Sequence, residues 1–165
     1  MQTIILPLAT ALFAIVAYVD LRTRRIPNEL IVGFLALAAF RIALAGQPSA
    51  ALYTLAASAA LFVATFLLFW RGVFGGGDVK LMAASALLVG YHDLFEFLFV
   101  MSVCGALVAA AVLAVDRLGL RPVPCPQTTP GPEDHQTSAR LTVPYGVAIA
   151  AAGVFTLLVQ TLISR

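Results

Sequence analysis

The chain has 165 residues, of which 61% are hydrophobic and 11% are charged, and its formal net charge is +2. Soluble domains hold roughly 45–50% apolar and about 25% charged residues, so this composition excludes a soluble domain and indicates an integral membrane protein. Such a small net charge, without a basic stripe interleaved with aromatic residues, excludes nucleic acid as a partner. The length predicts a single membrane-embedded domain over residues 1–165.

Six apolar runs divide the chain. About 20 apolar residues in a helix cross the roughly 30 Å hydrocarbon core, and backbone in lipid must satisfy its own hydrogen bonds. We therefore expect an all-α polytopic membrane protein with six transmembrane helices. No Lys or Arg precedes the first run and no small-residue cleavage site follows it, so we expect a retained span rather than a signal peptide. The runs cover approximately residues 3–19, 29–45, 50–70, 79–91, 94–115 and 142–163.

The positive charges decide whether the fourth and fifth runs are separate. Tyr91-His92-Asp93 between them is either a turn or the middle of one long helix. Lys and Arg favour cytoplasmic loops. Six spans with the N-terminus outside put eight of ten basic residues in the cytoplasm, whereas merging the two runs gives six against four. The charges therefore predict six spans. The cytoplasmic set is Arg22, Arg24, Arg25, Arg71, Lys80, Arg117, Arg121 and Arg140, with Arg41 and Arg165 outside.

The joints between spans carry most of the remaining polar residues. Residues 116–141 form the longest polar segment and hold five prolines, so we expect a flexible cytoplasmic loop. Pro27-Asn28-Glu29 opens the second span, where Asn28 is expected to cap the first free N–H groups. Cys104 and Cys125 make no CxxC or Cys/His cluster, so we expect neither a disulfide framework nor a metal site.

Two aspartates stand apart from the other carboxylates. Asp20 closes the first apolar run and Asp78 opens the fourth. Two spans separate them, an even number, so both face the same side of the membrane in either orientation. The charge distribution makes that side the cytoplasm. Both lie at helix ends, hence at similar depth, and the count of spans therefore allows the two carboxyls to meet.

Such a pair has a known chemical use. Two carboxyls within a few ångströms cannot both ionise comfortably and share one proton, so one can take a proton from water while the other polarises a carbonyl. The alternative is structural: each aspartate caps a helix or pairs with Arg22, Arg24 or Lys80. His92 is expected on the outer side and His135 in the polar loop, so neither is a candidate base.

The glycines Gly75, Gly76 and Gly77 directly precede Asp78. Glycine removes the side chain, allows positive φ and lets another backbone approach closely. The fourth run is short, roughly 20 Å of helix, so we expect water to reach Asp78. A phosphate-binding loop is excluded, because no Gly-Lys-Ser/Thr and no strand–helix unit is present.

These residues resemble the type IV prepilin peptidase family. Gly75-Gly76-Gly77-Asp78 matches its G-x-G-D signature, and Asp20 with the downstream Arg25-Ile26-Pro27-Asn28 matches its other catalytic block. Pro144-Tyr145-Gly146 resembles the third block, and the stretch V-P-Y-G-V-A-I-A at residues 143–150 looks most like the Flp/Tad-pilus branch. The three blocks fall in order on the six expected spans.

The resemblance implies an aspartic endopeptidase of the bacterial inner membrane that cuts the leader peptide from prepilins at the cytoplasmic face, without metal or cofactor. It implies a catalytic pair, Asp20 and Asp78, and a prepilin with its hydrophobic helix as the partner. Longer family members add a methylating domain, and we expect this chain to lack it. Substrate-binding or site-shaping roles fall to Gly75, Gly76, Gly77, Lys80, Pro144, Tyr145 and Gly146.

Two other functions are consistent with the same residues. A small proton- or ion-coupled transporter would use Asp20 and Asp78 as titrating groups, but it would need them near the membrane midplane. A non-catalytic membrane subunit would bind helical partners through small residues and leaves the paired aspartates unexplained.

Overall fold

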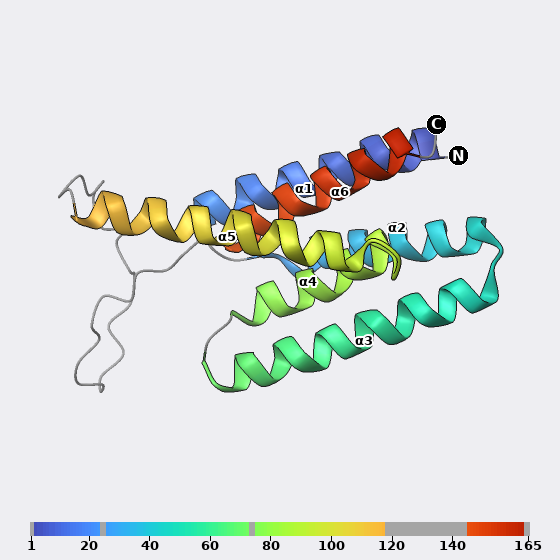
Figure 1. The fold of residues 1–165 in the computed structure, drawn as a ribbon, viewed down its shortest axis with the longest axis horizontal. Helices are drawn as coiled ribbons and strands as arrows, with labels where there is room; N and C mark the ends of the chain where they lie inside the picture. The colour runs from blue at the N-terminus through green and yellow to red at the C-terminus, as the bar shows by residue number, and fades with distance from the viewer. Residues whose placement is uncertain (1, 24–25, 73–74, 118–144, 164–165) are drawn as a thin grey trace.

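The computed structural model describes residues 2–23, 26–72, 75–117 and 145–163, which form six helices and no strand (Figure 1). The predicted all-α fold is therefore confirmed for this part of the chain. Most of the polar segment 116–141 and residues Arg25 and Pro144 lie outside the described residues. The helices are α1 (Gln2–Thr23), α2 (Asn28–Ala45), α3 (Pro48–Trp70), α4 (Gly76–Val89), α5 (Leu94–Arg117) and α6 (Tyr145–Ile163).

The helices differ in their reach across a membrane. Five of them, α1, α2, α3, α5 and α6, are long and apolar enough to cross. Helix α4 has 14 residues, about 21 Å of helix against roughly 30 Å of hydrocarbon. It ends at Gly90, whose φ of 95° suits glycine, and α5 begins at Leu94. The interpretation of Tyr91-His92-Asp93 as a turn is thus confirmed.

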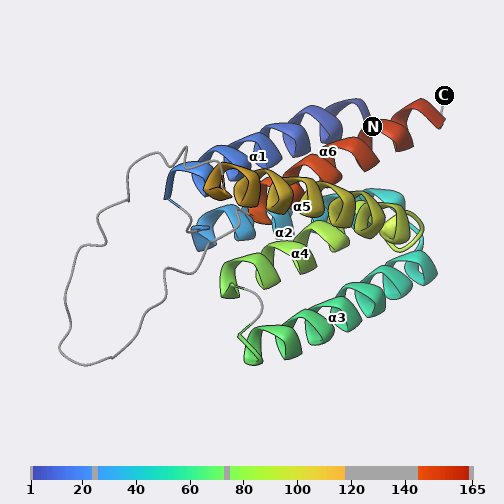
Figure 2. The ribbon, with the colours of Figure 1, turned by 60° about the vertical axis from the view of Figure 1, so that its left-hand side comes forward.

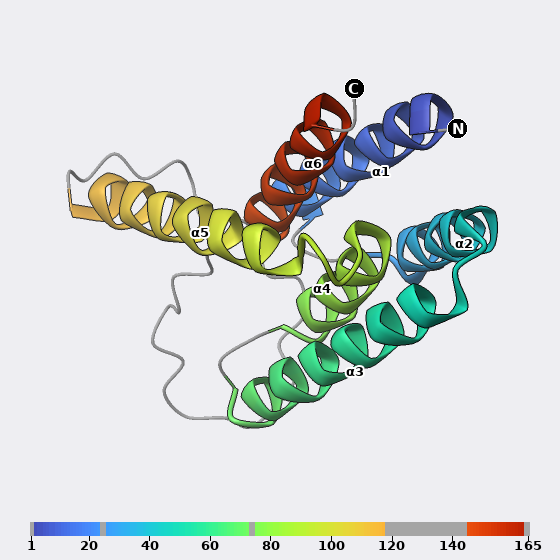
Figure 3. The same ribbon diagram turned by 45° about the vertical axis from the view of Figure 1, so that its right-hand side comes forward.

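Helix α4 lies at the centre of the bundle. It packs against α2, α3, α5 and α6, and eight of its 14 residues are buried. Figure 3 shows it between α3 on one side and the α5–α6 pair on the other. The longer helices instead turn large apolar side chains outward, among them Leu52, Phe95 and Leu107. Such an apolar exterior suits lipid, and the structure is that of a multi-pass helical membrane protein.

Successive helices run in opposite directions (Figures 1 and 2). One end of the bundle therefore gathers the ends of α1, α3 and α5 and the starts of α2, α4 and α6. Among the described cations, Arg22, Arg71, Lys80 and Arg117 lie toward this end and Arg41 lies toward the other. We call the first the basic end. Asp20 and Asp78 share it, as the count of spans predicts.

The expected role of Asn28 is wrong. Helix α2 already begins at Asn28, and the cap position falls on Pro27, which makes no side-chain cap. Since Asn28 lies inside the first turn, its side chain is directed elsewhere: its Oδ1 accepts a hydrogen bond from Lys80 Nζ at 3.3 Å. That bond joins the starts of α2 and α4.

Packing of α1 on α6 depends on Gly153. The fully buried Phe13 ring contacts Phe34 edge-on, with centroids 4.7 Å apart, and covers the position where a Cβ at residue 153 would lie. A methyl group there collides with the ring itself, which has no flexible end to move aside. Gly33 faces Leu12 instead, whose Cδ2 would lie an ordinary 3.4 Å from an added Cβ.

We predict that Gly153→Ala lowers the free energy of unfolding in detergent by about 1–3 kcal/mol, the usual cost of overpacking a core. Gly33→Ala is the matched control, because it makes the same change in a helix beside a flexible side chain and should cost less. Thermal unfolding of the purified variants measures both. Equal effects of the two substitutions would contradict the assigned packing.

Candidate active site

Asp20 occupies a core position of α1. Ala9, Phe13 and Val16 precede it on the same helix face at spacings of four and three residues, and all are buried. Asp20 continues this stripe by a further four residues and is only 5% exposed. A carboxyl at the next core position of an apolar stripe is uncommon, because burial of a charge is costly. The surroundings of Asp20 must therefore offset the cost of burying its carboxyl.

Gly146, the second residue of α6, supplies part of that environment. A Cβ at residue 146 would lie 2.7 Å from Asp20 Cγ and 2.9 Å from Asp20 Cβ. These separations are too short for non-bonded carbon atoms, so any larger residue would displace the carboxyl. Glycine at this position lets the start of α6 approach the end of α1 and sets the place of Asp20.

Asp78 is the third residue of α4 and folds back on the turn before it. Its carboxylate accepts a hydrogen bond from the Gly75 N–H, the residue at the N-cap. This is the return half of a capping box, in which the third helical residue bonds the cap N–H. An added Cβ at Gly75 would lie 3.1 Å from Asp78 Oδ2. The capping alternative thus holds for Asp78, but it uses only part of the carboxylate's capacity to accept hydrogen bonds.

The two carboxyls lie within electrostatic range of one another. The charged groups next to them in sequence make other contacts: Arg22 Nη1 donates to Tyr18 Oη at 2.6 Å, and Lys80 Nζ donates to Asn28. Arg24 lies outside the described residues. Two acids whose charges interact, one buried and one half-buried, favour a state with one proton between them.

The three glycines before Asp78 adopt ordinary backbone angles, and other side chains of the protein lie close to them. Gly75 has φ −76° and Gly76 and Gly77 are helical, so none of the three uses the positive φ that glycine allows. An added Cβ would lie 3.4 Å from the Phe69 ring at Gly76 and 3.4 Å from Ile26 Cβ at Gly77. Much of the space left by these two glycines is therefore taken by the chain's own side chains.

Two contacts of this site were not anticipated from the sequence. Phe69 comes from the last turn of α3, and Ile26 from the segment before α2. Only Ile26 carried a signal, through its place in the Arg25-Ile26-Pro27-Asn28 block. Tyr145 begins α6 beside Gly105 of α5, where an added Cβ would lie 3.9 Å from Tyr145 Cε1. Pro144, expected with them, lies outside the described residues.

The fold and the site together define a multi-pass helical membrane protein with two acids from different helices at one end of its bundle. A family model described as the type IV leader peptidase family matches residues 7–110, and the chain belongs to this family. The match includes Asp20 and Asp78 and stops before α6. The family match therefore does not cover Gly146, whose site-shaping role the resemblance implies and whose closeness to Asp20 the structure supplies.

One curated relative is the prepilin leader peptidase/N-methyltransferase of Bacillus subtilis (strain 168). The two are 35% identical over 116 residues, which is 69% of this chain and 47% of the relative. The chain thus spans about half the length of this relative. No solved structure matches the chain.

Proposed function

We propose that the chain is an aspartic endopeptidase that removes the leader peptide from Flp-type prepilins at the cytoplasmic face of the inner membrane. The observation that carries the proposal is the electrostatic proximity of Asp20 and Asp78, which come from α1 and α4. Family membership supports it, as does the relative whose name includes prepilin leader peptidase. The resemblance of the segment at the start of α6 to the Flp branch supports the narrower proposal that the substrate is an Flp-type prepilin.

The proposed mechanism uses the one proton that the pair shares. The ionised carboxylate accepts a proton from water as the water oxygen attacks the scissile carbonyl carbon, while the protonated partner donates to the carbonyl oxygen. Collapse of the tetrahedral intermediate breaks the C–N bond, and the new amine takes the proton that the base had accepted from water. The leader leaves with a carboxyl terminus. The Gly75 N–H and the tight fit of Gly146 hold the two acids in place.

The distribution of positive charges supports the proposed orientation. Lys and Arg favour cytoplasmic ends, and the described cations gather toward the end that holds Asp20 and Asp78, except Arg41. A prepilin, in the family's sense, keeps its hydrophobic helix in the bilayer, so its cleavage point lies at the membrane surface. Acids at the bundle's end suit that substrate, whereas an ion carrier would need them near the middle of the helices.

Replacement of either acid by its amide tests the proposal. Asp20→Asn and Asp78→Asn keep the shape and remove the shared proton and the base, so we expect cleavage to fall about 10³-fold or more. Glu29→Gln makes the same chemical change at an exposed position of the same end and should cleave normally. The measurement is the mass of a co-expressed Flp-type prepilin. Full cleavage by either Asn variant would refute the catalytic pair.

Gly146→Ala tests the fit around Asp20. The added methyl must push the carboxyl aside, and a shift of about 1 Å in a reacting group costs about 10²-fold in rate. Gly105→Ala is the control, because its Cβ would make only ordinary contacts of 3.9 Å with Tyr145 and Ala148. Initial cleavage rates at equal amounts of inserted enzyme give the comparison, and equal rates for both variants would oppose the assigned contact.

The orientation has its own test. We expect a cysteine at His92, whose side chain is 85% exposed in the α4–α5 turn, to react with an impermeant maleimide added from outside. A cysteine at Arg71 should react only in inverted vesicles. Both would be placed in a chain whose own cysteines are replaced. Labelling of residue 71 from outside would mean that the proposed orientation is reversed.

A further inference from the structure

Helix α4 is too short to reach both membrane surfaces, so the polar backbone groups at its ends need partners within the protein. The last carbonyl groups of a helix have no partner within the helix. In a long span they meet water or headgroups, but a helix of about 21 Å ends before it reaches them. The described residues show what meets these carbonyls at the end opposite Asp78.

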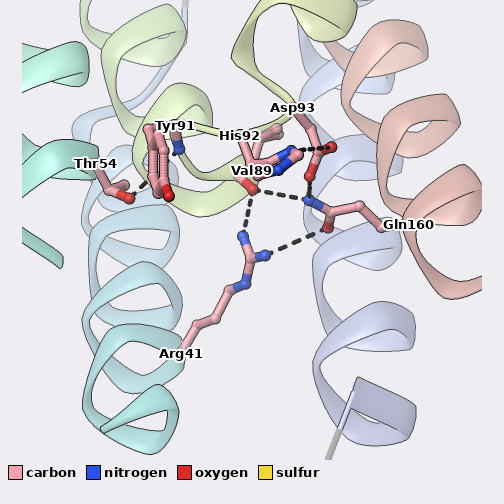
Figure 4. A network of polar contacts seen from close by, with 7 residues as sticks. All are labelled: Arg41, Thr54, Val89, Tyr91, His92, Asp93 and Gln160. Carbon is pink, nitrogen blue, oxygen red and sulfur yellow. Dashed lines mark hydrogen bonds and ion pairs between the residues drawn. The ribbon is translucent and has the colours of Figure 1, made fainter. Parts of the chain in front are cut away.

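Side chains of two neighbouring helices bind the end of α4 (Figure 4). Arg41 of α2 donates through Nη1 to the Leu88 carbonyl and, at 2.6 Å, to the Val89 carbonyl. Gln160 of α6 donates through Nε2 to the same Val89 carbonyl at 3.0 Å. The backbone of Gly90 follows immediately in a positive-φ conformation. The last two carbonyls of α4, those of Leu88 and Val89, thus have side-chain partners from neighbouring helices.

The same side chains are joined to one another. Arg41 Nη2 approaches Gln160 Oε1 at 3.4 Å, and Gln160 Nε2 also donates to Asp93 Oδ2. Asp93 lies within electrostatic range of Arg41 and offsets its charge. The cluster therefore links α2, α6, the end of α4 and the turn before α5. We call Arg41, Gln160 and Asp93 the α4 anchor.

The helices that supply the anchor also meet the candidate active site. Helix α2 contacts α4 at its start through Asn28 and Lys80, and α6 contacts Asp20 through Gly146. Asp78 lies eleven residues before Val89, about 16 Å along the helix axis. Fixing the depth and rotation of Val89 therefore fixes the depth and rotation of Asp78.

We propose that Arg41 and Gln160 are positioning residues for Asp78, which hold α4 at the depth and rotation where its carboxyl meets that of Asp20. This inference rests on the proposed peptidase function. A shift of α4 by one residue moves Asp78 by about 1.5 Å and turns it by about 100°. Such a displacement separates the acids without touching either of them. Arg41 then does more than indicate which side of the membrane its loop faces, and Gln160, which had no expected function, also positions α4.

The test measures the position of α4 and the reaction separately. Arg41→Met and Gln160→Leu remove the donors at similar size, while Arg41→Lys retains a donor and the charge. Gln47→Leu is the matched control, since Gln47 is exposed at the start of α3 on the same side of the bundle. Each is combined with Lys80→Cys, an exposed position two residues after Asp78, in a chain without other cysteines. Inverted vesicles are then labelled with an impermeant maleimide.

We expect Arg41→Met and Gln160→Leu to change the labelling rate at residue 80 several-fold. In the chain that retains Lys80, they should lower kcat about 10-fold to 100-fold with little change in KM, as displacement of a reacting group predicts. Arg41→Lys should recover much of kcat, and Gln47→Leu should match the parent in both measurements.

Normal kcat and normal labelling in the inserted Arg41→Met and Gln160→Leu variants would overturn the inference, and so would a loss of kcat with unchanged labelling. If Arg41→Met or Gln160→Leu does not insert into the membrane, the Arg41→Lys variant provides the test. A labelling rate at residue 80 and a kcat equal to those of the parent support the anchor, and a changed labelling rate or a lower kcat opposes it. The labelling requires no catalysis, so it tests the position of α4 even if Asp78→Asn proves active and the proposed peptidase fails.

Discussion

The length of α4 is the constraint on which the rest of the structure depends. A helix of 14 residues among helices of 18 to 24 cannot bring both ends to the membrane surfaces. Polar groups in hydrocarbon must find partners within the protein. The last carbonyls of α4 are accordingly bound by Arg41 and Gln160 of neighbouring helices, and at the other end the Gly75 N–H meets the Asp78 carboxylate of α4 itself.

The short helix also explains which parts of the protein surround Asp78. Because α4 is enclosed by its neighbours, its first turn presents a carboxyl inside the bundle's end rather than on its surface. Asp20 reaches the same region by continuing the buried stripe of α1, and Gly146 allows α6 to close over it. Two acids on separate helices thus depend on the same packing. An active site of this kind is specified by helix depth as much as by residue type.

Much of this arrangement could be predicted from the sequence. The apolar runs located all six helices to within a few residues, and an even number of spans put Asp20 and Asp78 at one end. These inferences succeed because the length and apolar character of a run can be read directly from the sequence. The capping role expected of Asn28 failed because a cross-helix bond to Lys80 competes for its side chain. The glycines before Asp78 adopt ordinary backbone angles, and only Gly75 lies so close to another side chain, that of Asp78, that an added Cβ would be tight.

Beyond the resemblance that placed Gly146 in the site, the contacts that depend on three-dimensional packing left no sequence signal. Gly146 and Asp20 are far apart along the chain, and Arg41 reads as an isolated charge outside the cytoplasm until the end of α4 is placed beside it. Gln160 lies in an apolar span without any recognisable motif. To predict hydrogen bonds from one helix to the last carbonyls of another, one must know the relative depth of the two helices in the membrane. Composition does not give that depth.

The central claim is that Asp20 and Asp78 act as one catalytic unit, and a double-mutant comparison tests it most directly. Residual prepilin cleavage is measured in long single-turnover reactions for Asp20→Asn, Asp78→Asn and the double variant. If the acids share one proton and one task, the double variant should be no slower than either single variant within about 3-fold, as for residues that act together. Losses that multiply in the double variant would contradict the account.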